Sequence, residues 1–233
     1  MRTKTLLLTA VLSAAGIATS LAQGTVYSVN AVGYVNQTFA TAGFYIISNP
    51  LNSGNNAIST VIPNAPDGAV VYRFSSTGGF DTDPPNYIAG SGWFTSKGAA
   101  TTVLAPGEAF FVQIPSGATL PVTMTFVGEV PQGTSLSNPV TLKAGTFSLL
   151  ASQVPLSAKL SDPLMNFPAA DGDTIYFYRN GSYSNPAYSF VQGAGWFQGA
   201  TAADPTPGVG EGFFLFSGAT TDRTWTRSFS VNP

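Results

Sequence analysis

The sequence predicts an all-β protein of two tandem homologous antiparallel units, each like a β-sandwich or barrel, with very little helix. Apolar runs rich in Val, Ile, Thr, Phe and Tyr are separated by clusters of Gly, Pro, Asn and Asp, which is typical of strands and turns. Residues 105–112 (APGEAFFV) return near the C-terminus as residues 209–215 (VGEGFFL). Residues 123–127 and 224–229 alternate between two faces, which indicates antiparallel strands with one buried face.

The N-terminus has the pattern of a secretory signal peptide. Arg2 and Lys4 form a short basic region, residues 6–21 are apolar, and residues 20–22 (SLA) place small side chains at the cleavage-determining positions. The apolar stretch is short and interrupted by polar residues, which argues against a membrane anchor. We therefore expect residues 1–22 to be removed on export through the Sec pathway. The mature protein is expected outside the cell or on its surface, with the periplasm as an alternative.

The mature chain is expected to be mildly acidic and poor in charge. The sequence has no Cys and no His, and 9% of its residues are charged. Removing Arg2 and Lys4 leaves 7 basic residues against 11 acidic ones, so the net charge changes from −2 to −4. Such a surface does not attract phosphate backbones, and no later stretch is long and apolar enough to span a bilayer. We expect no nucleic-acid partner and no membrane span, and the oligomeric state is left open.

The strands can be placed in chain order. They are predicted at residues 26–34, 44–48, 69–74, 109–114 and 122–127, and then at 147–151, 174–179, 212–216 and 223–231. Asn180-Gly181 tolerates positive φ at both turn positions and predicts a tight hairpin. Short helices are predicted at residues 56–62 and 159–166, ended by Pro63 and Pro168.

The two units align at an offset of about a hundred residues, longer than a solenoid repeat. The equivalent positions are mostly Gly, aromatic and acidic: Ala42-Gly43/Ala144-Gly145, Asp67/Asp171, Tyr72/Tyr176, Trp93/Trp196, Gly107-Glu108/Gly210-Glu211, Phe110/Phe213 and Phe126/Phe229. We expect a first unit at residues 23–130, a polar, turn-rich junction at 131–143 and a second unit at 144–233. A last strand around Phe229 is expected to close the second sheet. The units are either separate domains or halves of one pseudo-symmetric domain.

Carboxylates are the only catalytic side chains that this composition favours. Without His and Cys, the Ser-His-Asp and Cys-His mechanisms and imidazole or thiolate zinc sites are excluded. No phosphate-binding or dinucleotide-binding glycine motif is present. A glycosidase needs two carboxylates facing one sugar, and the candidates are Asp81, Asp83, Glu108, Asp171, Asp173 and Glu211.

The acidic residues have a simpler interpretation as parts of turns. Residues 81–86 and 171–173 supply alternating oxygens of the kind that Ca²⁺ takes, but no Glu follows at EF-hand spacing. We interpret the repeated acids as acceptors of backbone N–H groups within turns; they are Asp67, Asp171, Glu108 and Glu211. We therefore expect no metal, no cofactor and no catalysis.

Aromatic residues in or beside loops are the candidates for ligand binding. Rings in such places can stack on sugars; the candidates are Trp93, Trp196, Tyr87, Tyr183 and Tyr188. The alternative is that the duplicated Trp93 and Trp196 anchor the two cores. We favour the core interpretation for both tryptophans.

Two segments carry a resemblance to known sequences. Residues 42–51 (AGFYIISNPL) and residues 105–112 (APGEAFFV) together resemble bacterial extracellular β-modules with a "GWNLISLP…PGKGYWV" pattern. Residues 26–34 (VYSVNAVGY) resemble secreted repeat proteins common in Verrucomicrobia, which are generally of unassigned function. The second unit departs from the pattern, with Thr146 where the first has Phe44. The resemblance implies a secreted β-protein and brings no catalytic residue.

The sequence therefore predicts an exported structural or adhesive β-repeat protein of the cell surface or extracellular matrix, without catalysis. Its partners are expected to be extracellular polysaccharide or other surface proteins. A carbohydrate-binding module that uses loop aromatics is the first alternative, and a carboxylate-based hydrolase is the second.

Overall fold

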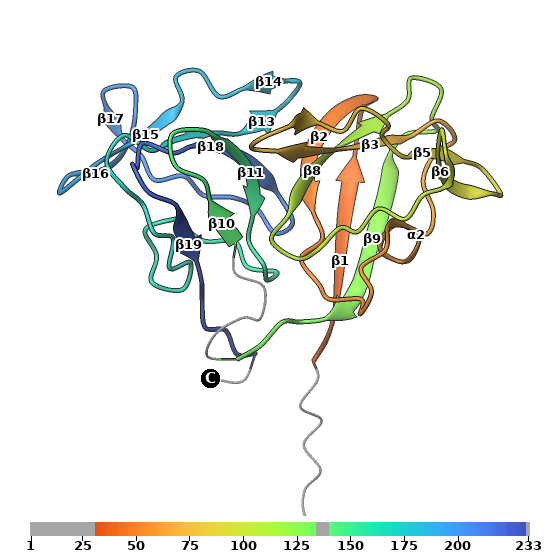
Figure 1. Cartoon of the computed structure of the whole chain (residues 1–233), viewed down its shortest axis with the longest axis horizontal. Helices are drawn as coiled ribbons and strands as arrows, with labels where there is room; N and C mark the ends of the chain where they lie inside the picture. Colours follow the sequence, from red (N-terminus) through yellow and green to blue (C-terminus); the bar gives the residue numbers. More distant parts are fainter. Residues whose placement is uncertain (1–30, 134–139, 232–233) are drawn as a thin grey trace, which may run out of the picture. The chain divides into compact units, whose positions relative to one another are not determined.

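Strands make up almost all the regular structure of the chain (Figure 1). The computed structural model describes residues 31–133 and 140–231. The expected signal peptide and residues 26–30 of the first expected strand lie outside this range. Within the described residues no helix is long and apolar enough to cross a membrane.

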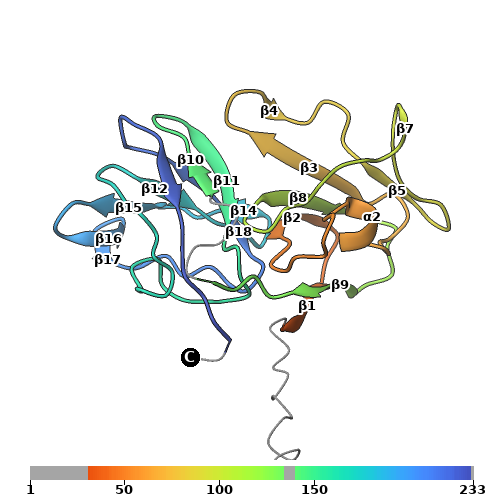
Figure 2. The same ribbon diagram turned by 60° about the horizontal axis from the view of Figure 1, so that its bottom comes forward.

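The first half consists of a seven-stranded antiparallel sheet and a two-stranded ribbon. The sheet has the order β2-β8-β3-β5-β6-β7, and β4 pairs with β3. Its strands are β2 (Gly43–Ser48), β3 (Val70–Ser75), β4 (Gly79–Phe80), β5 (Asn86–Ile88), β6 (Gly92–Thr95), β7 (Gly98–Ala99) and β8 (Ala109–Ile114). The ribbon pairs β1 (Val32–Phe39) with β9 (Val122–Glu129), and Figure 2 shows it beside β2 and β8. The helix α2 (Ile58–Val61) follows β2.

The second half uses the same strand order. Its six-stranded sheet runs β11-β18-β12-β15-β16-β17, and β10 pairs with β19 as a short ribbon. The strands are β10 (Val140–Leu142), β11 (Phe147–Ala151), β12 (Thr174–Tyr176), β13 (Tyr178–Arg179), β14 (Ser182–Tyr183), β15 (Tyr188–Val191), β16 (Gly195–Gln198), β17 (Thr201–Ala202), β18 (Gly212–Phe216) and β19 (Arg223–Trp225).

The structure confirms the all-β fold class. Strands β8, β11 and β18 have the predicted bounds. The predicted hairpin at Asn180-Gly181 joins β13 to β14, with φ of 54° and 78° at the two turn residues. The hairpin strands β4 to β7 and β15 to β17 were not predicted, because each has only two to four residues.

The helix predicted at residues 159–166 is wrong, because this segment forms turns. The Asp162 side chain accepts a hydrogen bond from the backbone N–H of Leu164, and the Leu160 N–H donates to the carbonyl of Pro205. Such side-chain and loop partners compete with helical hydrogen bonds. The other predicted helix corresponds to α2, which is four residues long.

Each half has its own apolar core. In the first half, Phe110 and Val112 of β8 pack with Phe126 of β9 and with Leu51. In the second half, Phe213 and Leu215 of β18 pack with Trp225 of β19. Strands β8 and β18 are apolar on both faces, so alternate side chains are left to pack on the opposite side of each sheet.

The second ribbon corrects one of the sequence equivalences and two of the predicted bounds. Phe39↔Val122 is the last pair of the first ribbon and Leu142↔Arg223 is the last pair of the second, so Val122 corresponds to Arg223. Four residues further along each chain segment, Arg227, not Phe229, is therefore the counterpart of Phe126. The Phe229 side chain packs instead against the core of the first half, and its backbone pairs with Gly133. The predicted final strand over residues 223–231 therefore ends early, at Trp225. Part of the predicted junction, residues 140–142, is β10.

The two halves meet through a reciprocal contact. The backbone N–H of Ser48 donates to the carbonyl of Gly210 over 2.9 Å, and that of Ala151 donates to the carbonyl of Gly107 over 3.1 Å. Single β-bridges join Ile47 to Glu211, and Leu150 to Glu108, in the same reciprocal way. This is the pattern of a two-fold interface between equivalent surfaces, and residues 31–233 form one compact unit.

Candidate functional site

Ten aromatic side chains gather on the sheet faces that point away from the two cores. Because successive side chains of a strand point to opposite faces, Phe110 of β8 enters the core and Phe111 faces the other way. The ten occupy five positions that occur in both halves. The pairs, which we call the aromatic face, are Phe44/Phe147, Tyr72/Tyr176, Phe74/Tyr178, Phe80/Tyr183 and Phe111/Phe214.

This pairing corrects one further sequence equivalence. Phe44 lies opposite Gln113 in the β2–β8 ladder, and Phe147 lies opposite Phe216 in the β11–β18 ladder. Phe147, rather than Thr146, therefore occupies the position of Phe44. Alignment on the nearby glycines had shifted the comparison by one residue.

The same ring contacts recur in the two halves of the aromatic face. The Phe44 and Phe111 ring centroids are 6.3 Å apart at 81°, and those of Phe147 and Phe214 are 6.1 Å apart at 88°. The hairpin pairs Phe74–Phe80 and Tyr178–Tyr183 both meet at 69°, at 5.2 and 5.0 Å. Edge-on contacts of this kind are favourable arrangements of aromatic rings.

Rings from the two halves also touch one another. The ring centroids of Phe74 and Phe214 are 5.1 Å apart, and those of Tyr178 and Phe111 are 5.6 Å apart. These two contacts are equivalent, so the aromatic face is continuous across the contact between the halves. Phe111 and Phe214 are buried near its centre, whereas the rings around them remain accessible.

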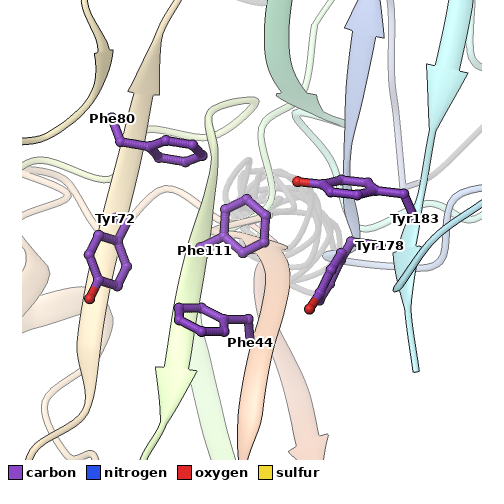
Figure 3. Close-up of a pocket in the computed structure, with 6 residues that line it drawn as sticks. All are labelled: Phe44, Tyr72, Phe80, Phe111, Tyr178 and Tyr183. Carbon is purple, nitrogen blue, oxygen red and sulfur yellow. The ribbon is translucent and has the colours of Figure 1, made fainter. Parts of the chain in front are cut away.

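The aromatic face forms an open groove (Figure 3). Its volume is about 390 Å³, and it is lined by Phe44, Tyr72, Phe80, Phe111, Tyr178 and Tyr183. Figure 3 shows Phe111 between the Phe44–Tyr72–Phe80 side and the two tyrosines of the β13–β14 hairpin. Phe44 and Phe80 are 41% and 45% exposed, and Tyr183 is 45% exposed. A cluster of exposed rings on a protein surface is a feature of interaction sites.

A second groove begins on the other side of Tyr183 and has a different character. Its volume is about 390 Å³, and we call it the polar groove; it is lined by Phe177, Arg179, Ser182, Tyr183, Ser184, Asn185, Tyr188 and Gln198. A larger hollow of about 850 Å³ shares Tyr183, Ser184 and Asn185 with it and continues towards Phe147 and Phe214. Tyr183 therefore lines all three spaces.

The polar groove contains a neutralised charge. The Arg179 guanidinium donates to both carboxylate oxygens of Glu211, over 2.5 and 2.6 Å, and it lies 4.1 Å from the centre of the Phe177 ring. The hydrogen bond to Glu211 raises the pKa of Arg179. Burial, followed by the neighbouring Tyr178, raises the pKa of the Tyr183 phenol above its ordinary value, so this hydroxyl is neutral at physiological pH.

The repeated carboxylates have structural partners. Asp67 accepts a hydrogen bond from the backbone N–H of Ala89, and Asp171 accepts one from Gln192, each over 2.9 Å. These two bonds are equivalent. Each ties the loop before β3 or β12 to the turn of the β5–β6 or β15–β16 hairpin. Glu211 accepts from the backbone N–H of Gly208 over 2.7 Å. Glu108 lies 3.8 Å from the guanidinium of Arg73.

The remaining acidic candidates are also engaged. Asp81 pairs with Arg73 over 3.1 Å, and Asp83 accepts from the backbone and hydroxyl of Ser96, which lowers its pKa. Asp173 is fully buried and accepts from both terminal nitrogens of Arg223, over 2.8 and 2.7 Å. No three acidic residues converge within the described part of the chain. Each acidic candidate thus has a hydrogen-bond or ion-pair partner in the described part of the chain.

The structure divides the aromatic candidates into two groups. Trp93 and Trp196 are 4% and 5% exposed, and Tyr87 is 6% exposed. The Trp93 indole donates to the carbonyl of Ile62 over 2.7 Å, and its ring meets that of Tyr87 at 5.2 Å. These three side chains offer no ring face to a ligand, so the stacking alternative is wrong for them. Tyr183 and Tyr188 lie in the polar groove.

Most of the aromatic face was missed from the sequence. Phe44, Phe80 and Phe147 belong to strands, whereas the residues predicted from the sequence to bind a ligand lie in or beside loops. A signal was present, because Phe111 and Phe214 follow Phe110 and Phe213 in strands that are apolar on both faces. Comparison with models of protein families, with curated proteins and with solved structures finds no match.

Proposed function

We propose that the mature protein is an exported, non-catalytic adhesive protein that contacts its partner through the aromatic face. The observation that carries the proposal is the exposure of rings such as Phe44, Phe80, Phe147 and Tyr183 on one continuous face built from both halves. Large apolar groups that a fold leaves accessible in a cluster favour an interaction role. The signal-peptide pattern supports action outside the cell.

The state of the carboxylates supports a non-catalytic role. Hydrolysis of a sugar would need two carboxyl groups facing the same bond. The candidates are instead held by backbone N–H groups or by arginines, and Asp173 is buried beneath Arg223. Their positions explain turns and ion pairs without a reaction.

A carbohydrate-binding role is the second candidate. It is favoured by Tyr183 and Tyr188, which lie in one groove with hydroxyl and amide side chains. The two roles are compatible, because a glycan is one of the surfaces to which an exported protein can adhere.

Adsorption measurements test the adhesive role. Residues 23–233 are applied to an alkyl-coated sensor and to insoluble cellulose and chitin, and the bound mass is recorded. The double variant Phe44→Ser/Phe80→Ser should adsorb at least about tenfold more weakly, a loss of about 1.4 kcal/mol. The reason is that it removes two accessible rings from the aromatic face.

A matched control distinguishes adsorption through the aromatic face from nonspecific hydrophobic adsorption. Val32 and Val127 on the β1–β9 ribbon are 73% and 51% exposed and lie outside the aromatic face. The variant Val32→Ser/Val127→Ser should adsorb like the unchanged protein. Equal losses in both double variants, or no adsorption of the unchanged protein on any surface, would contradict the proposal.

A further inference from the structure

The polar groove combines the two kinds of side chain that sugars require. Tyr183 and Tyr188 supply ring surface, and Ser182, Ser184, Asn185 and Gln198 supply hydroxyl and amide groups. Gln198 donates an amide N–H to the Pro186 carbonyl over 3.0 Å, so it can still offer a ligand its amide oxygen. The Ser184 hydroxyl accepts from the Phe177 N–H over 3.3 Å, so it can still donate its own proton. Sites for small ligands typically pair apolar ring surface with a few such polar groups.

The charge of the groove favours a neutral ligand. Among the described residues that line it, Arg179 alone is charged, and Glu211 binds it with both carboxylate oxygens. A guanidinium neutralised in this way offers little attraction to an acidic sugar, since its favoured partner is already a carboxylate. No lining carboxylate is present to attract a cation.

The first half shows that the fold does not require these groove residues. The ladder pairs Val70↔Asn86 and Thr174↔Ser189 place Pro85 at the position of Tyr188. The pairs Asn86↔Phe94 and Ser189↔Phe197 place Thr95 at the position of Gln198.

The hairpin residues differ in the same way. Asp81 and Ser184 occupy equivalent positions, since their N–H groups donate to Arg73 and Phe177 at corresponding places in the two sheets. The residue after each is Thr82 in the first half and Asn185 in the second. The second half therefore has one ring, one hydroxyl and two amides where the same backbone in the first half carries Pro, Asp and two Thr residues.

The neighbouring hollow indicates an extended ligand. It shares Tyr183, Ser184 and Asn185 with the polar groove and has a volume of about 850 Å³. A chain bound beside Tyr188 can therefore continue past Tyr183 towards Phe147 without leaving the surface hollows.

We propose that the polar groove binds a neutral oligosaccharide chain, with Tyr183 and Tyr188 contacting sugar rings and Asn185 and Gln198 binding hydroxyl groups. The inference rests on the proposed adhesive role, because the glycan is taken to belong to the same partner surface that the aromatic face contacts. It adds the ligand class and assigns specificity to the second half.

Binding to soluble polysaccharides tests the inference. Affinity electrophoresis of residues 23–233 is run in gels that contain dextran, galactomannan, xyloglucan or arabinoxylan, with alginate as the acidic comparison. The unchanged protein should be retarded by at least one neutral polymer and not by alginate. The variant Tyr188→Ala/Asn185→Thr should bind at least about tenfold more weakly, and Gln198→Thr, which installs the first-half residue, should also weaken binding.

The control uses an exposed ring outside both proposed binding surfaces. Tyr34→Ala removes a ring that is 68% exposed and lines neither the aromatic face nor the polar groove. It should leave retardation by the neutral polymer unchanged, and a melting curve on each variant excludes unfolding as the cause of a loss.

Three results would overturn the inference. They are the absence of retardation by every neutral polymer, retardation by alginate alone, and groove variants that bind like the unchanged protein. If the protein still adsorbs through the aromatic face in these cases, the adhesive role stands and only the glycan assignment fails. Loss of adsorption as well would remove the proposed function itself.

Discussion

The two halves share a sheet order and an aromatic face, but they fill the equivalent space beside that sheet differently. In the second half, Asp173 and Arg223 form a buried ion pair, and the second Arg223 nitrogen also donates to Ser217. The ladder register places Ala69, Val122 and Ile114 at these positions in the first half. The same backbone therefore accepts either an apolar cluster or a buried network of charge.

A second pair of equivalent positions also has an apolar residue in the first half and a charged one in the second. Phe126 is fully buried in the first half, and its counterpart Arg227 is 2% exposed. Arg227 donates to the Ser152 hydroxyl and to the Leu164 carbonyl, each over 2.7 Å. Burial lowers the pKa of Arg227 to about 10. At both positions the chemical type of the side chain changes while the fold stays the same. The terminal nitrogens of Arg223 and Arg227 find partners, although the buried Nε atom of each has none among the described residues.

The largest expected effect concerns a feature that the halves share. Trp93→Ala and Trp196→Ala should each reduce the free energy of unfolding by about 3–5 kcal/mol, the usual result of emptying a buried aromatic site. For a chain of this size each kcal/mol corresponds to about 2–4 °C in melting temperature. Calorimetry of the two variants measures the effect in each half.

A surface aromatic provides the control for the tryptophans. Tyr34 is 68% exposed, and Tyr34→Ala should change stability by no more than about 0.5 kcal/mol. Melting curves of both tryptophan variants that match the unchanged protein would show that these rings are not core anchors.

The next effect tests the feature in which the halves differ. Asp173→Ala should cost about 3 kcal/mol, because it leaves the Arg223 charge buried without its carboxylate. The Arg223 partners at Ser217 and at the Pro168 carbonyl remain, which keeps the loss at the lower end of the range for broken buried pairs. Chemical denaturation measures it.

The double variant Asp173→Ala/Arg223→Val installs the residues of the first half. It should recover most of the lost stability, since replacing a buried ion pair by apolar groups is often neutral or stabilising. A double variant less stable than Asp173→Ala would mean that the second half depends on the pair in a way that the first half does not.

Much of the fold was predictable, because strands and turns have local causes. The apolar runs at Phe147–Ala151 and Gly212–Phe216 and the Asn180-Gly181 turn specify their structure through side-chain type and backbone freedom. The short hairpin strands have only two to four residues each, too few for a periodic pattern. The end of β19 depends on a distant partner, because Phe229 pairs with Gly133. Such pairing leaves no local pattern in the sequence.

The candidate site was less predictable than the fold. Tyr183 and Tyr188 were identified because they lie near loops, and they do lie in one groove. Trp93 and Trp196 have similar Gly-rich surroundings but are buried, so flanking residues do not distinguish a groove residue from a core residue. The aromatic face arises only when strands from both halves come together.

The smallest expected effect concerns the paired acids Glu108 and Glu211, which occupy the same turn. The Nε and Nη2 atoms of Arg179 donate to the two carboxylate oxygens of Glu211 over 2.5 and 2.6 Å, whereas the nearest Arg73 nitrogen lies 3.8 Å from the Glu108 carboxylate. Burial raises the pKa of Glu108 above its ordinary value of 4.5, and Arg73 only partly opposes this. The folded state therefore holds the Glu108 proton more tightly than the unfolded state, and this contribution to stability is lost as pH rises through the folded-state pKa.

Replacing Glu108 by Gln removes that titration. The stability of Glu108→Gln relative to the unchanged protein should therefore increase between about pH 4 and about pH 7, as measured by denaturant unfolding at each pH. Glu211→Gln is the matched variant, and it should lower stability at neutral pH by no more than about 1 kcal/mol, because Arg179 is half exposed. A Glu108→Gln protein whose relative stability falls over this pH range would show that Glu108 is stabilised as a carboxylate, and that the two turns hold their acids in the same way after all.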